Sequence, residues 1–165
     1  MKTPKKNQNV LKPDKPSTPK ALAMKALIIY QDATDAVKAN AALQHATQSP
    51  DVHVEWNIRP WRVDMLKFLP AAAEALADAA DAHLIVFAGG ARSSPHWLQD
   101  WLEQWAGRRQ IQTAALAVID TGGVDKLSRS VAFDLYQFAN RHGLSIIFDD
   151  PGWLNMAHHF PQDFY

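Results

Sequence analysis

The chain has 165 residues, of which 47% are hydrophobic, and these values fit one globular domain with a sizeable buried core. It contains no cysteine, which excludes disulfides, thiolate catalysis, iron–sulfur clusters and cysteine zinc sites. The net charge is zero, but it is unevenly spread. Residues 1–24 hold six lysines and one aspartate, a balance of +5, so the remaining residues carry −5.

Residues 1–24 form a basic segment rich in lysine and proline, which predicts a disordered tail. Three interpretations stay open: a solvated extension, a basic arm that touches an acidic partner or nucleic acid, or a stretch that is not translated because translation begins at Met24. The acidic balance of the remaining chain disfavours nucleic-acid binding. No apolar run is long enough to span a bilayer or to act as a secretory signal, so we expect a cytoplasmic protein without membrane contact.

Short apolar runs alternate with helical patterns along residues 25–150. The expected strands are residues 25–32, 52–58, 83–88, 113–120 and 144–148, and the expected helices are residues 35–48, 71–82, 95–108 and 125–142. In the first helix, Val37, Ala41 and Leu43 are expected to face inward, and Gly143 is expected to close the last one. The sequence from Arg59 to Arg62 is expected to begin a loop.

Strands that alternate with helices predict an α/β fold with a parallel sheet. The second strand alternates apolar and polar residues, as an edge strand does, which favours the order 2-1-3-4-5 of flavodoxin-like domains with helices on both faces. We therefore expect a flavodoxin-like domain at residues 25–150. Residues 151–165 are expected to form an aromatic-rich extension that packs on it.

Ligands of such sheets bind beyond the carboxyl ends of the strands. Two of the loops there contain glycine pairs, which let backbone amides approach a ligand or merely end a strand tightly. The candidate pocket residues are Gln31, Asp32, Thr34, Gly89, Gly90, Ser93, Ser94, Thr121, Gly122 and Gly123.

The segment around the third strand carries a family resemblance. Its residues are Ala80-Asp81-Ala82 before the strand, then Pro95, Leu98, Asp100, Leu102 and Glu103, and later Ala115 to Val118 and Thr121-Gly122-Gly123. In these residues the chain resembles the NADPH-dependent FMN reductase group of flavodoxin-like proteins. The resemblance implies a flavodoxin-like fold, an FMN cofactor and NAD(P)H oxidoreductase activity. It also implies a Ser/Thr-rich phosphate loop after the first strand.

That loop here reads Gln31-Asp32-Ala33-Thr34-Asp35, in which only Thr34 is of the expected kind and two carboxylates would repel a phosphate. A response-regulator receiver is a second comparison, because Asp32 and Thr121 have counterparts in it. The third strand, however, is followed by no phosphoacceptor Asp and the fifth by no Lys. The sequence therefore excludes a phosphorylatable receiver, although not a receiver-like domain that has lost the chemistry.

Other catalytic and metal motifs are missing from the sequence. Asp32, Asp120 and Asp149 follow strands that are not mutual neighbours in the expected order, and His158-His159 lacks further ligands, so no metal site is predicted. No Gly-x-Ser-x-Gly elbow and no Gly-x-Gly-x-x-Gly motif occurs.

Trp97, Trp101 and Trp105 lie four residues apart and form one stripe along a helix. The stripe is either core or, at its outer edge, an interface with a partner protein or a second copy of the chain. Together these patterns favour a non-catalytic domain that binds a partner protein or a small ligand. The alternative is an FMN-dependent NAD(P)H oxidoreductase with an atypical phosphate loop.

Overall fold

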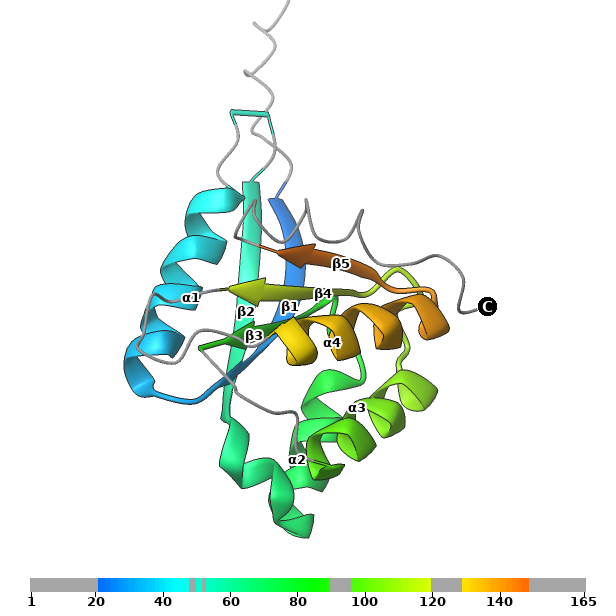
Figure 1. The fold of residues 1–165 in the computed structure, drawn as a ribbon. Helices are drawn as coiled ribbons and strands as arrows, with labels where there is room; N and C mark the ends of the chain where they lie inside the picture. The colour runs from blue at the N-terminus through cyan, green and yellow to red at the C-terminus, as the bar shows by residue number, and fades with distance from the viewer. Residues whose placement is uncertain (1–20, 48–49, 52, 90–95, 120–128, 149–165) are drawn as a thin grey trace, which may run out of the picture.

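A computed structural model describes residues 21–47, 50–51, 53–89, 96–119 and 129–148 (Figure 1). Its centre is a parallel five-stranded sheet with the order β2-β1-β3-β4-β5, which confirms the predicted topology. The strands are β1 (Ala21–Tyr30), β2 (His53–Arg62), β3 (Leu84–Ala88), β4 (Ala115–Ile119) and β5 (Ser145–Phe148).

Helices cover both faces of the sheet. Helix α1 (Ala33–Ala46) packs on one face, where Ala39 and Leu43 meet Ile28 and Val86. On the other face lie α2 (Leu69–Ala79), α3 (His96–Arg108) and α4 (Arg129–His142) (Figure 1). A short 3₁₀ helix, η1 (Val63–Lys67), joins β2 to α2.

Successive side chains of a strand point to opposite faces of the sheet, so each strand contributes to both cores. In β1, Leu27 and Ile29 join the core under α2, α3 and α4, whereas Ile28 joins the core under α1. β3 is buried at every position, as expected for a strand that has a helix layer on each side.

Strand β2 extends to Arg62, so the prediction that Arg59 to Arg62 begins a loop is wrong. Pro60 lies inside the strand opposite Ile28. A strand tolerates proline at the edge of a sheet, where one side of its backbone needs no hydrogen bond, and β2 is such an edge strand.

The two tryptophans of β2 anchor it to helices on opposite faces. The indole N–H of Trp56 donates to the hydroxyl of Thr47 after α1, at 3.0 Å. The indole N–H of Trp61 donates to a carboxylate oxygen of Asp78 on α2, also at 3.0 Å. Trp61 therefore packs between the edge strand and α2, against the core on that face of the sheet.

Strand β1 begins at Ala21, four residues before the predicted start of the domain, and Ala21 pairs with His53. The basic segment of residues 1–20, the predicted extension of residues 151–165 and its two histidines lie outside the described residues.

Gly143 ends α4 as predicted. It has a φ of 65°, and Leu144 donates its backbone N–H to the carbonyl of Ala139 at 2.8 Å. In α1 the expected inward set is wrong at Val37, which is 69% exposed, and at Ala41, which is also exposed. Ala39 and Leu43 are the residues of α1 that are buried.

Candidate functional site at the carboxyl edge of the sheet

The carboxyl ends of the three central strands lie side by side. Tyr30 at the end of β1 pairs with Ala88 of β3, and Ala88 pairs with Ile119 of β4. These strand ends form one edge of the sheet, beyond which the sequence predicts a pocket. Of its residues the structure describes Gln31, Asp32, Thr34 and Gly89; Gly90, Ser93, Ser94, Thr121, Gly122 and Gly123 lie outside the described residues.

The first turn of α1 carries two carboxylates. Asp32 is the N-cap residue, and the Oδ2 atom of Asp35, three residues later, accepts the backbone N–H of Asp32 at 3.3 Å. This is the returning half of a capping box. A helix N-terminus attracts anions because its amides and dipole are positive, and here the chain's own carboxylates occupy that position.

Gly89, which follows β3, lies against the first turn of α1. Its φ is 105°, and a Cβ atom at this position would lie 2.6 Å from Oδ2 of Asp35 and 3.5 Å from Cβ of Gln31. The Asp35 carboxylate therefore lies against the Cα atom of Gly89, and only glycine leaves room for it. The candidate pocket residues predicted from the sequence do not include Asp35, although it stands three residues after Asp32, which is the spacing of a capping box.

The tryptophan stripe of α3 is mostly core. Trp101 and Trp105 are 1% and 0% exposed, and their indole N–H groups donate to the carbonyls of Ala72 and Ala79 on α2, at 3.1 Å and 2.9 Å. The interface prediction is wrong for these two residues, because the stripe faces α2 and the sheet. Trp97 is half-buried at the margin of this core.

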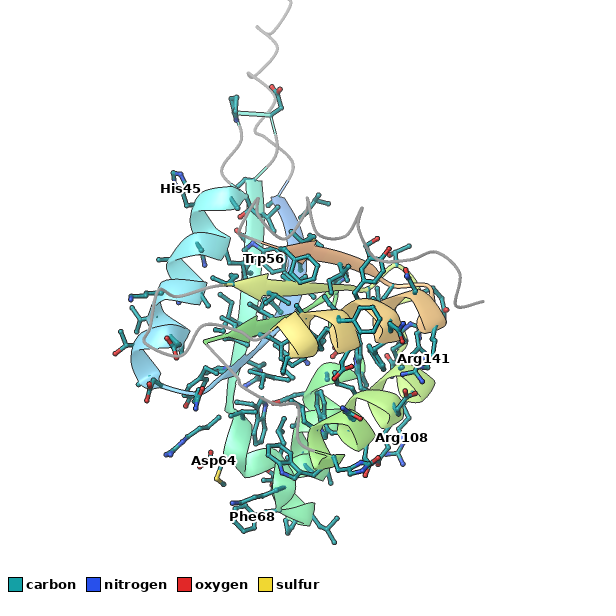
Figure 2. The ribbon with its side chains drawn as sticks, in the orientation of Figure 1. His45, Trp56, Asp64, Phe68, Arg108 and Arg141 are labelled. Atoms are coloured by element: carbon teal, nitrogen blue, oxygen red, sulfur yellow. The ribbon has the colours of Figure 1, made fainter. Side chains whose placement is uncertain are left out.

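Exposed apolar side chains gather instead where β2 leads into α2. Met65, Phe68 and Leu69 are 42%, 53% and 85% exposed, and we call them the η1 cluster. Figure 2 shows Phe68 at the end of the molecule from which η1 and α2 project. Lys67 places its ammonium group 5.4 Å from the centre of the Phe68 ring. The residues predicted from the sequence do not include this cluster.

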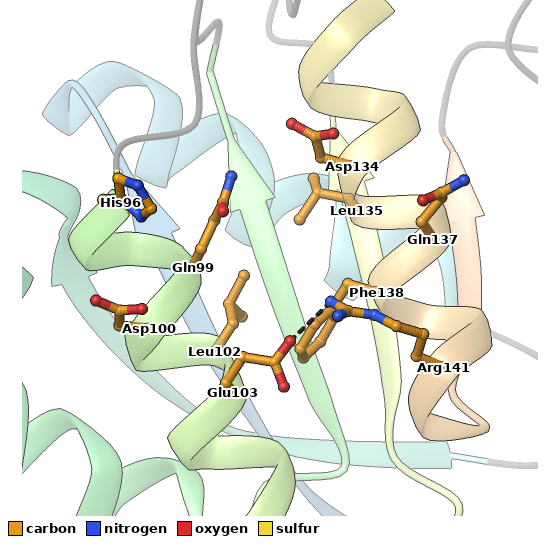
Figure 3. A pocket seen from close by; sticks show the side chains of 10 residues that line it. All are labelled: His96, Gln99, Asp100, Leu102, Glu103, Asp134, Leu135, Gln137, Phe138 and Arg141. Carbon is orange, nitrogen blue, oxygen red and sulfur yellow. Dashed lines mark hydrogen bonds and ion pairs between the residues drawn. The ribbon is translucent and has the colours of Figure 1, made fainter.

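A second surface feature is a polar groove of about 330 Å³ between α3 and α4 (Figure 3). Its lining residues from α3 are His96, Gln99, Asp100, Leu102 and Glu103, and those from α4 are Asp134, Leu135, Gln137, Phe138 and Arg141. The side chain of Glu103 bridges the two helices. It binds Arg141 at 2.7 Å through Oε1 and lies 2.7 Å from Nε2 of His142 through Oε2.

At the opposite edge of the sheet, Lys25 links β1 to the segment before β3. Its ammonium group lies 2.6 Å from a carboxylate oxygen of Asp81, and this hydrogen bond lowers the pKa of Asp81 below its usual value of 3.8. The backbone N–H of Lys25 donates to Nδ1 of His83 at 3.0 Å. This acceptor role places the proton of a neutral His83 ring on Nε2. These contacts hold β1 against the segment before β3, which is a structural role.

Within the described ranges, no group of three or more His, Asp or Glu side chains is placed to hold a metal ion. The described helices include none that is both long and apolar enough to cross a membrane.

The strand order and the placement of the helices define a flavodoxin-like α/β domain. No protein-family model and no curated protein matches the chain. Among solved structures it is similar to the crystal structure of the flavodoxin-like domain of a Synechococcus protein. The two are 20% identical with a TM-score of 0.45, over 76% of this chain and 84% of that one. At this level of similarity the fold assignment rests on the strand order, not on the neighbour.

Proposed function

We propose that this chain is a non-catalytic flavodoxin-like domain that binds a partner protein. The observation that carries the proposal is the η1 cluster, in which Met65, Phe68 and Leu69 expose large apolar side chains within five consecutive positions of the chain. Apolar side chains that gather on a surface, rather than lying singly, are typical of protein interaction sites. Charged groups flank them, namely Lys67 and an ion pair between Arg62 and Asp64 at 3.1 Å, so the surface is amphipathic, as the rim and centre of an interface are.

The first turn of α1 supports the non-catalytic part of the proposal. A flavin phosphate bound at this helix N-terminus would have to displace the Asp35 carboxylate from the backbone N–H of Asp32. It would also approach two negative charges at close range. This position therefore favours a neutral or cationic contact over a phosphate.

The alternative is the FMN-dependent NAD(P)H oxidoreductase that the sequence resemblance implies. The topology favours it, because β1 and β3 flank the point at which the strand order reverses, and FMN binds there in flavodoxin. A visible spectrum of the purified protein and a titration of FMN against tryptophan fluorescence separate the two functions. A colourless protein without quenching up to millimolar FMN is expected. A yellow protein, or quenching at micromolar FMN, would overturn the non-catalytic proposal.

The η1 cluster is tested by cross-linking the tagged protein in a lysate of its native cell. The Phe68→Ser and Leu69→Ser double variant is expected to lose a cross-linked partner that the unchanged protein captures. Val37→Ser serves as the control, since Val37 is also exposed but lies on α1, away from the cluster. A partner retained by the double variant, or lost equally from the control, would contradict the role of the cluster.

A further inference from the structure

The charge of the chain is divided between one segment and the domain. Residues 1–20 contain six lysines and one aspartate, and residues 21–24 contain no charged side chain. The segment thus carries +5, and residues 21–165 carry −5. Opposite charges of this size on one chain attract each other wherever the domain concentrates its carboxylates.

The groove between α3 and α4 is one place where carboxylates are concentrated. Asp100 and Glu103 line it from α3 and Asp134 lines it from α4 (Figure 3). Glu103 is bound to Arg141. The side chains of Asp100 and Asp134 have no ion pair or hydrogen bond with the residues that the structure describes. Among the described residues, these two carboxylates therefore have no cationic partner.

The groove already holds one cation of its own. The guanidinium carbon of Arg141 lies 6.0 Å from the centre of the Phe138 ring, while its NH2 group donates to Glu103 at 2.7 Å. An aromatic ring beside a carboxylate is the chemistry that binds guanidinium groups, and in this groove Arg141 occupies both, so a further cation would bind at Asp100 and Asp134. The amide groups of Gln99 and Gln137, on the same walls, can accept further hydrogen bonds from a cation or a peptide backbone.

We propose that the basic segment of residues 1–20 binds in the α3–α4 groove of its own chain, with lysine ammonium groups placed on Asp100 and Asp134. Twenty residues can span up to about 66 Å when extended. A domain of this size has a radius of gyration of about 15 Å, so the tether from Ala21 does not limit access to the groove. The tether raises the local concentration of the segment, which favours this contact over the same contact between two chains. The groove is then occupied by the chain itself until a competing basic ligand displaces the segment. The proposal does not depend on the η1 cluster or on the absence of FMN.

Because the chain has no cysteine, one spin label can be placed without other changes. We would attach a nitroxide to the full chain at Asn9→Cys, which leaves every charge in place, and record the backbone amide signals by NMR. Selective loss of the signals of α3 and α4 around the groove is expected in about 10 mM salt. The signals are expected to return in about 1 M salt, which shortens the Debye length from about 30 Å to about 3 Å.

A matched pair of variants tests whether the groove is responsible. Asp100→Asn with Asp134→Asn is expected to abolish the selective signal loss. Glu55→Gln with Glu74→Gln, which makes the same charge change at exposed positions on β2 and α2, is expected to preserve it. Loss spread evenly over the domain, or loss that survives the groove variant, would overturn the proposal. A mixture of spin-labelled chains and isotope-labelled chains without a spin label gives the last test. Signal loss there equal to that within one chain would overturn the intramolecular contact in favour of an exchange between chains.

Discussion

Substituting Gly89 by alanine tests the contact on which the candidate site is built. The backbone φ of 105° is one that an L-residue adopts only with strain, at a cost of about 1–2 kcal/mol. The new Cβ would lie 2.6 Å from Oδ2 of Asp35, so the carboxylate must move away. That movement breaks its hydrogen bond with the N–H of Asp32, and loss of a helix cap costs about 0.5–2 kcal/mol. We therefore expect the free energy of unfolding to fall by about 1.5–4 kcal/mol.

Urea denaturation of Gly89→Ala against the unchanged protein measures this difference. Gly107→Ala is the matched control, because a Cβ at Gly107 in α3 would meet nothing within 4 Å. That substitution is expected to raise the free energy of unfolding by up to about 1 kcal/mol, through the better helix propensity of alanine. The pair separates the local clash from any general effect of replacing glycine.

A second background isolates the role of Asp35. When Asp35→Ala is already present, Gly89→Ala should cost only the backbone strain of about 1–2 kcal/mol, because no carboxylate remains to be displaced. An equal cost in both backgrounds would refute the inference that the Asp35 carboxylate rests against Gly89. A cost near zero for Gly89→Ala in the Asp35→Ala background would show that the backbone strain at residue 89 does not lower the stability.

Three further predictions concern the contacts that hold the elements together. Trp105→Phe should lower the free energy of unfolding by about 1–3 kcal/mol, measured by urea denaturation, because it leaves a cavity and removes one of the two hydrogen bonds that the Ala79 carbonyl accepts, the other coming from the N–H of Ala82. Asp81 has a folded pKa below 3.8, so its bond with Lys25 stabilises the fold above that pH and is lost as the pH falls through the folded pKa. For this exposed pair, Asp81→Asn should cost at most about 1 kcal/mol at pH 7 and nothing in strong acid, in thermal unfolding followed across pH. Arg109→Lys should lower the free energy of unfolding by about 1–3 kcal/mol in urea denaturation. One ammonium group cannot reproduce the two guanidinium hydrogen bonds, both 2.8 Å long, to the carbonyls of Ala106 in α3 and His142 in α4.

The sheet could be predicted because its signals are local. The run from Leu84 to Ala88 is apolar throughout, which marks a strand covered on both faces, and the alternation in β2 marks an edge strand. Pro60 was misread as the end of that strand because proline usually ends one. Its place at an unpaired edge is a property of the whole sheet and is not visible in the sequence around it.

The phase of the helices was harder to predict than their existence. Helix α1 is rich in alanine, so its apolar stripe is weak, and Val37 was placed inward although it is exposed. The stripe of α3 was predicted well as a pattern. The pattern could not show that both buried indoles would find carbonyls on α2, because those partners lie 29 and 26 residues earlier in the chain.

The candidate site also has one part that the sequence predicts and another part that depends on the fold. The spacing of Asp32 and Asp35 indicates a capping box from the sequence alone. The contact between Asp35 and Gly89 joins residues that are far apart in the chain and depends on the pairing of β1 with β3. Exposure of Phe68 likewise depends on how η1 leaves the sheet, since the same residues in a covered loop would be core.

The two polar regions described here share one electrostatic preference, and this bears on what the domain can bind. At the start of α1 the carboxylates of Asp32 and Asp35 offset the positive end of the helix. In the groove, Asp100 and Asp134 add negative charge beside Glu103, which is already paired with Arg141. Both places therefore favour cations over phosphates. The η1 cluster differs, because its apolar side chains lie beside Lys67 and beside the ion pair of Arg62 with Asp64, so a partner that binds there is expected to present an apolar surface with an acidic group that meets Lys67.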